Sequence, residues 1–224
     1  MRLLLIVVWL VFPVSAGAVE HVLVIDSAHG GKDTGVKLSR NVHEKDVTLA
    51  IAQQVKKNLS GSVDITVRLT RLDDSDVSTA ERKTILQQTH TDLAISIHVN
   101  AGFGQQAEGY EVYYRGHEAP SPRGNNAGEI VSDMEQTQRF NNSVLFAQIV
   151  QKNMRQVFPR KGRGLREAPV HLLQSLTVPG ILLEVGFSTE VKENKQLRDP
   201  DVQKAIASAL TRSVKEYFSA GGTS

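Results

Sequence analysis

Short apolar runs alternate with amphipathic stretches along most of this chain, and this alternation restricts the fold more than any other feature. Several runs are apolar at successive positions, which is typical of β-strands covered on both faces. The stretches between them repeat apolar residues every three or four positions, as helices with one buried side do. Strands alternating with helices indicate an α/β fold with a largely parallel sheet. The expected strands occupy residues 21–25, 63–70, 92–97, 109–114 and 180–185.

Capping patterns mark where helices begin. Ser78 and Glu81 have the spacing of a capping box, and Asp199 followed by Pro200 is typical of a helix N-terminus. We therefore predict a single α/β domain, with a mostly parallel twisted sheet of about five to six strands flanked by helices on both faces. The run at 109–114 follows its predecessor after a short loop, so we expect an antiparallel or edge strand there.

Two polar segments are predicted to be loops. Residues 115–142 are rich in Pro, Gly and Asn at their start and are expected to form an exposed loop that leads into a helix. The basic segment 160–166 is expected to be a solvated loop. The last residues, 220–224, are expected to be a disordered tail.

The first 18 residues have the layout of a secretory signal peptide. One arginine precedes an apolar run of about a dozen residues, and Ala16-Gly17-Ala18 fits an A-x-A cleavage site. The run is short of the roughly 20 residues that a membrane-spanning helix needs. We therefore predict a Sec-type export signal (residues 1–18), a periplasmic or secreted mature protein and no membrane span after cleavage.

Charge and cysteine content exclude other classes. The net charge is +2 and no strongly basic face is evident, so nucleic acid is not an expected partner. The chain has no cysteine, which excludes disulfides and thiolate metal sites. The domain must therefore be stabilised by its hydrophobic core.

Candidate catalytic residues follow the ends of the predicted strands. His29, His98 and Glu184 each lie at such an end, and the carboxyl ends of parallel strands meet at one edge of a sheet. Glu184 follows three apolar residues, so an ionised carboxylate there needs a partner. Glu44, in the first turn of the next helix, is a fourth candidate, and His43 competes with it.

These residue types fit a metal-assisted hydrolase. Two imidazoles and one carboxylate match the His₂Glu ligand set of catalytic zinc sites, and a second carboxylate would then be the general base. The loop "HGGKDTG" has neither glycine spacing of the phosphate-binding motifs, so we interpret its glycines as allowing the backbone to pass close to a metal.

Five motifs together resemble one enzyme family. They are "DSAHGGKDTG", "EKDVTLAIA", "RLTR", "SIHVNA" and "LLEVGF". Their types and order resemble the zinc-dependent N-acetylmuramoyl-L-alanine amidases of the type-3 amidase family, which hydrolyse bacterial cell walls. The resemblance runs over nearly all of the chain after residue 20 and makes residues 19–219 one catalytic amidase domain.

The resemblance implies the roles of four residues. One Zn²⁺ per chain would be held by His29, Glu44 and His98, with Glu184 as the catalytic carboxylate. It also implies the substrate, peptidoglycan, and the bond, the amide between the lactyl group of N-acetylmuramic acid and L-alanine. Two alternatives stay open from the residues alone. One is a zinc hydrolase of another cell-wall substrate, a deacetylase or peptidase, and the other is a non-catalytic peptidoglycan-binding module.

The chain departs from the family pattern in three places. Ser27-Ala28 replaces the usual Pro-Gly before the first histidine, and His171 replaces an aromatic residue. After "GF", where many members have a Ser-Asn pair, this chain has Ser188-Thr189-Glu190. Some relatives carry a long insertion that blocks the zinc until a protein activator removes it. The segment 115–142 is short for such an insertion, so we predict activity without a dedicated activator or only light restraint by this segment. A protein activator is thus a partner that the sequence allows but does not require.

Overall fold

The structure is a computed structural model, which describes residues 20–88, 90–102, 104, 107–116, 127–159, 161–174 and 176–222. The predicted signal peptide and the last two residues of the predicted tail lie outside these ranges. Among the described residues, no helix is both long and apolar enough to cross a bilayer.

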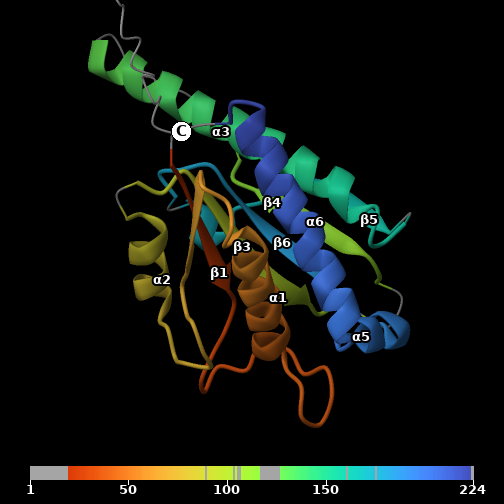
Figure 1. Ribbon diagram of the computed structural model, residues 1–224. Helices are drawn as coiled ribbons and strands as arrows, with labels where there is room; N and C mark the ends of the chain where they lie inside the picture. The colour runs from red at the N-terminus through yellow and green to blue at the C-terminus, as the bar shows by residue number, and fades with distance from the viewer. Residues whose placement is uncertain are drawn as a thin grey trace, which may run out of the picture.

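The described elements alternate between strand and helix over most of the chain, as predicted (Figure 1). The strands are β1 (His21–Ser27), β2 (Ile65–Leu69), β3 (Leu93–Asn100), β4 (Tyr110–Tyr114), β5 (Gly162–Glu167) and β6 (Gly180–Phe187). The helices are α1 (Glu44–Leu59), α2 (Thr79–Leu86), α3 (Ala127–Met154), α4 (His171–Gln174), α5 (Val191–Leu197) and α6 (Pro200–Ser219).

The strands form one 6-stranded sheet in the order β2-β1-β3-β6-β4-β5. Strands β2, β1, β3 and β6 are mutually parallel, whereas β4 runs antiparallel to β6 and β5 runs parallel to β4. The carboxyl ends of β1, β3 and β6 therefore meet at one edge, where α/β sheets bind ligands. The mostly parallel sheet and the antiparallel strand at 110–114 are confirmed.

The two faces of the sheet are covered differently. Helices α1, α6 and α3 lie side by side over one face (Figure 1), where they bury the larger apolar cluster. The opposite face is covered by the short helices α2 and α4, with a smaller cluster of apolar residues. Helices therefore flank both faces, but one face is much more open than the other.

Two predictions about loops were wrong. Residues 162–167 form β5 rather than a solvated loop. β5 pairs with one neighbour only and buries little, so its sequence is charged and lacks the apolar alternation of a strand. Helix α3 begins at Ala127, well inside the segment predicted as a loop. The first half of α3 is exposed, whereas its second half packs in the core. Extending an existing helix by one residue costs little free energy, because the costly nucleation step has already been made.

Candidate active site

His29 lies in the loop that follows β1, in an unusual backbone conformation. Its φ is 61°, in the left-handed region, and a backbone bridge between Gly30 and Asp33 closes the turn behind it. The carboxylate of Asp33 lies 2.8 Å from the His29 Nδ1. This contact fixes the ring and directs the Nε2 atom toward Glu44, which is 3.1 Å away.

Gly35 allows this loop to pass against the site. A Cβ atom at this position would lie 2.5 Å from both the His29 ring and the Glu44 carboxylate, and its φ is +62°. Any side chain would therefore displace the two residues that meet here. The predicted role of the loop glycines, close approach of the backbone, fits this geometry.

Glu44 is the first residue of α1, and its side chain is only 3% exposed. The backbone N–H of Val36 donates to Oε2 over 3.0 Å, and the N–H of Val99 donates to Oε1 over 2.9 Å. These bonds tie the carboxylate to the loop on one side and to β3 on the other. The carboxylate is therefore held in place before any ligand binds.

His98 completes a cluster of three. Its Nδ1 atom lies 3.1 Å from Glu44 Oε1, and one ligand atom each from His29, Glu44 and His98 lie within 4.8 Å of one another. The cluster is a possible metal site, with the nitrogen and oxygen donors that zinc prefers.

The contacts in this cluster shift two pKa values in opposite directions. The hydrogen bond to Glu44 raises the pKa of His29 to about 9, against the opposing effect of burial. Burial opposes ionisation of Glu44, but hydrogen bonds from both histidines outweigh it and lower its pKa. The contacts thus favour a negative charge on Glu44 and a positive charge on His29, and a metal cation would take the place of the His29 proton.

Glu184 stands beside this cluster. It is paired with His98 in the β3–β6 register, and both side chains leave the sheet on the open face. Its Oε2 atom is buried and has no hydrogen-bond partner among the described residues. Burial raises the pKa of Glu184 to about 7, and the nearby carboxylates of Glu44 and Glu111 act in the same direction. A carboxyl group that titrates near neutral pH can both accept and return a proton.

Two buried arginines, which the sequence analysis did not identify, hold the loop that carries His29. Arg71 donates to the backbone carbonyls of Ser27 and Ala28, and Arg82 donates to those of Ser27 and His29. Arg82 is also paired with the buried carboxylate of Asp26 at 2.6 Å. The only local signal was the position of Arg71 in the motif "RLTR".

Three other expectations concern residues near the site. His43 caps α1 and is not part of the metal cluster, whereas Glu44 is. Ala28 is buried and is not among the residues with positive φ, so the Ser27-Ala28 pair does not require a glycine there. The His171 Nε2 lies 2.8 Å from Lys83 Nζ, which gives this residue a contact between α4 and α2.

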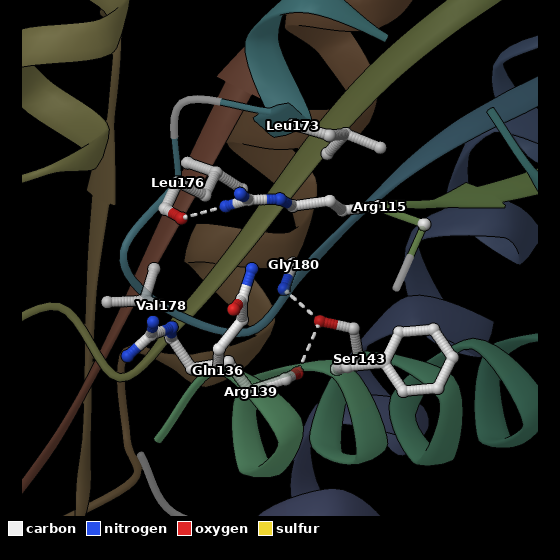
Figure 2. A pocket seen from close by; sticks show the side chains of 10 residues that line it. Arg115, Gln136, Arg139, Ser143, Leu173, Leu176, Val178 and Gly180 are labelled. Atoms are coloured by element: carbon white, nitrogen blue, oxygen red, sulfur yellow. Dashed lines mark hydrogen bonds between the residues drawn. The ribbon is translucent and has the colours of Figure 1, made fainter. Parts of the chain in front are cut away.

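A small pocket lies elsewhere, between α3 and the start of β6 (Figure 2). Figure 2 shows Ser143 of α3 accepting a hydrogen bond from the backbone N–H of Gly180, the first residue of β6. Glu184 lies four residues further along this strand, or about 13 Å. The cavity volume of about 20 Å³ holds little more than one water molecule, so it is not a substrate site.

Comparison with known proteins agrees with the geometry. The sequence profile of a family described as N-acetylmuramoyl-L-alanine amidase matches residues 23–216. N-acetylmuramoyl-L-alanine amidase AmiA of Escherichia coli (strain K12) is 29% identical over 222 residues, covering 89% of this chain and 76% of AmiA.

Two solved structures are similar over nearly their whole length. The catalytic domain of CwlV, an amidase from Bacillus (Paenibacillus) polymyxa var. colistinus, gives a TM-score of 0.74 at 29% identity, covering 89% of this chain and 98% of that one. The N-acetylmuramoyl-L-alanine amidase from Clostridium difficile 630 gives a TM-score of 0.74 at 29% sequence identity. The match covers 91% of this chain and 99% of that one.

Proposed function

The chain belongs to the N-acetylmuramoyl-L-alanine amidase family of peptidoglycan hydrolases, and from this premise we propose how its site cleaves the cell wall. The bond is the amide between the lactyl group of N-acetylmuramic acid and the L-alanine of the stem peptide. The observation that carries the proposal is the position of Glu184, buried without a partner beside His29, Glu44 and His98. The reaction would serve cell-wall remodelling, cell separation or recycling.

His29, Glu44 and His98 would hold one zinc ion. Two imidazole nitrogens and one carboxylate oxygen are the donors of many catalytic zinc sites, and Gly35 keeps the space beside them free of a side chain. When bound, zinc supplies a Lewis acid that polarises the amide carbonyl and favours attack by water. Asp33 would orient the His29 ring during binding, because it already bonds the Nδ1 atom.

Glu184 would act as the general base and then as the general acid. Its carboxylate takes a proton from the attacking water, and the carboxylic acid then delivers that proton to the leaving nitrogen of L-alanine. A pKa of about 7 suits both steps, since neither protonation state is strongly favoured at neutral pH. A module that only binds peptidoglycan has no use for an unpartnered buried carboxylate at this position.

Mass spectrometry of digested peptidoglycan tests the proposal directly. The purified protein with zinc should release stem peptides that begin with L-alanine and leave the glycan strands intact. Release of acetate would instead indicate a deacetylase, and shortened stem peptides would indicate a peptidase. Both of those results contradict the proposed bond.

The same digestion tests the need for an activator. We propose that the protein acts without a dedicated activator, or under light restraint only, because residues 115–142 are short for a blocking insertion. The protein purified alone should therefore release stem peptides. A digestion that starts only after a partner protein is added would contradict this part of the proposal.

We also propose that residues 1–18 direct export to the periplasm or the medium and are then removed. The support is the apolar run and its A-x-A site. The N-terminal sequence of the protein recovered from cells should begin at Val19. A retained Met1 would contradict cleavage.

A further inference from the structure

Two arginines of β5 lie over a buried carboxylate beside the site. Glu111 of β4 is 4% exposed, and its Oε1 atom lies 2.8 Å from the Nε of Arg163 and 3.2 Å from the Nε of Arg166. The arginine side chains themselves are 38% and 46% exposed. Their guanidinium groups therefore reach from a buried anchor to the surface.

Glu111 does not use up the hydrogen-bonding capacity of these arginines. Its other oxygen accepts from Asn100 Nδ2 over 3.1 Å and from the Tyr113 hydroxyl over 2.7 Å, which fixes the carboxylate. Each arginine faces Glu111 with its Nε, and the Arg163 guanidinium also lies over the Phe187 ring, 5.2 Å from its centroid. Among the described residues, the Nη groups of the two arginines form no hydrogen bond or ion pair. Two positive charges share one negative charge, so a further anion is favoured at this position.

The arginine pair lies close to Glu184, on the side away from the metal ligands. Glu111 is directly opposite Glu184 in the β4–β6 ladder, and both belong to the open face. Strand order then places β5 one strand beyond β4. At about 4.8 Å between neighbouring strands, the β5 backbone lies roughly 10 Å from that of Glu184.

The proposed reaction determines which part of the substrate faces β5. The general acid must contact the leaving nitrogen, so the peptide side of the amide lies next to Glu184. The metal cluster lies at β1 and β3, on the other side of β6. The stem peptide therefore extends from Glu184 toward β4 and β5. Two residues of extended peptide reach about 7 Å, which brings the second residue to the arginines.

We propose that Arg163 and Arg166 form a subsite for a carboxylate of the stem peptide, at its second residue. The proposal rests on the proposed function and names the substrate class that this site prefers. The ligand is an acidic stem peptide, in which D-glutamate is linked through its side chain and keeps a free α-carboxylate. Peptides in which that carboxylate is amidated lose the charge and one acceptor oxygen.

Two matched substrates test the subsite. They are N-acetylmuramoyl-L-alanyl-γ-D-glutamyl-L-lysine and the same compound with D-isoglutamine in place of D-glutamate. The side-chain carboxylate is in a peptide bond in both, so the two compounds differ only at the α-carboxylate. A charge-assisted hydrogen bond contributes about 1.5–3 kcal/mol, so kcat/KM should be at least about 10-fold higher for the acid. In Arg163→Ala and in Arg166→Ala this preference should fall several-fold, and in the double variant to less than about twofold. Arg68→Ala, an exposed arginine on the opposite edge strand β2, is the matched control and should keep the full preference.

Binding of the product peptides separates this inference from the proposed function. Calorimetry with L-alanyl-γ-D-glutamyl-L-lysine and with its D-isoglutamine counterpart measures the subsite without any cleavage. Equal affinity for the two peptides, or a preference that survives the double variant, would overturn the inference even if the enzyme is active. Failure to cleave either substrate would contradict the function instead. If the double variant melts early, the single variants decide, because each leaves Glu111 one arginine.

Discussion

The two faces of the sheet differ in what their side chains do. One face is covered by the long helices α1, α3 and α6, and its strand residues pack into the large apolar cluster. Within the part of the chain that the structure describes, the other face has only α2 and α4, with 8 and 4 residues. Polar side chains lie on this face at the carboxyl ends of the strands. His98, Glu184 and Glu111 all leave the sheet on this open face.

The same strands contribute to stability with the side chains on one face and to the site with the side chains on the other. Leu183 and Val185 are buried in the large cluster, and Glu184 between them points the other way. Because side chains alternate along a strand, one β6 serves both the core and the site. Changes on the covered face should therefore reduce stability, and changes on the open face should reduce activity.

The largest effect is expected from Glu184→Gln on the open face. Loss of the proton-transfer group should lower kcat for stem-peptide release by about 10³-fold or more. Zinc content, measured by atomic emission after dialysis, should stay at one per chain, because Glu184 is not a proposed ligand. Turnover close to that of the native protein would remove Glu184 from the mechanism.

The same variant should become more stable at alkaline pH. The folded pKa of Glu184 is raised from 4.5 to about 7, so the native carboxyl stabilises the fold at low pH and loses this contribution as pH rises through 7. With a chelator present, Glu184→Gln should therefore gain about 2–3 kcal/mol relative to the native protein between pH 5 and pH 8. Urea unfolding at the two pH values measures this. A pH-independent difference would contradict the raised pKa.

A core substitution on the covered face should lower stability and leave the activity of the folded protein unchanged. Phe146 of α3 is fully buried and contacts the ring of Tyr217 at 5.2 Å between centroids. Phe146→Ala should lower the free energy of unfolding by about 3–5 kcal/mol, with kcat of the folded fraction unchanged. Met134→Ala, on the exposed part of the same helix, is the control and should change stability by less than about 0.5 kcal/mol.

Arg82→Ala should lower both the free energy of unfolding and the affinity for zinc. Arg82 pairs with buried Asp26 and also holds the loop that carries His29. Removing one partner of a buried ion pair costs about 3–5 kcal/mol. Zinc affinity, measured by competition with a chelating dye, should fall as well. Lys204→Ala breaks an exposed ion pair with Asp201 and should cost less than about 1 kcal/mol. Equal effects of the two variants would contradict the role of the buried pair.

Local sequence patterns predicted those parts of the fold that depend on local burial. Val47, Ile51, Val55 and Leu59 recur every four positions, a pattern that predicts a helix, and all four are buried in α1. The apolar runs predicted five strands because each of these strands carries buried apolar residues, even the edge strand β2. β5 was missed because it is an edge strand with exposed charged residues, and its pairing with β4 is a long-range property.

The distinction between local patterns and long-range contacts applies to the site as well. His29, His98 and Glu184 could be proposed from the sequence because parallel strands bring their carboxyl ends together. The contacts of Arg82 with residues 27 and 29 were not predictable, since they join segments more than 50 positions apart. Glu111 carried the signal that had identified Glu184, an acid between apolar strand residues, but no motif drew attention to it.

The smallest effect is expected from Asp33→Asn, at the exposed edge of the site. The Asp33 side chain is 69% exposed, so the substitution should change the free energy of unfolding by less than about 0.5 kcal/mol. Its contact with His29 Nδ1 orients the ring, and loss of such a contact typically lowers metal affinity by about 10–100-fold. We expect the lower end of this range, because solvent competes for the bond. Chelator competition measures the affinity, and an unchanged value would show that the backbone of the loop alone positions His29.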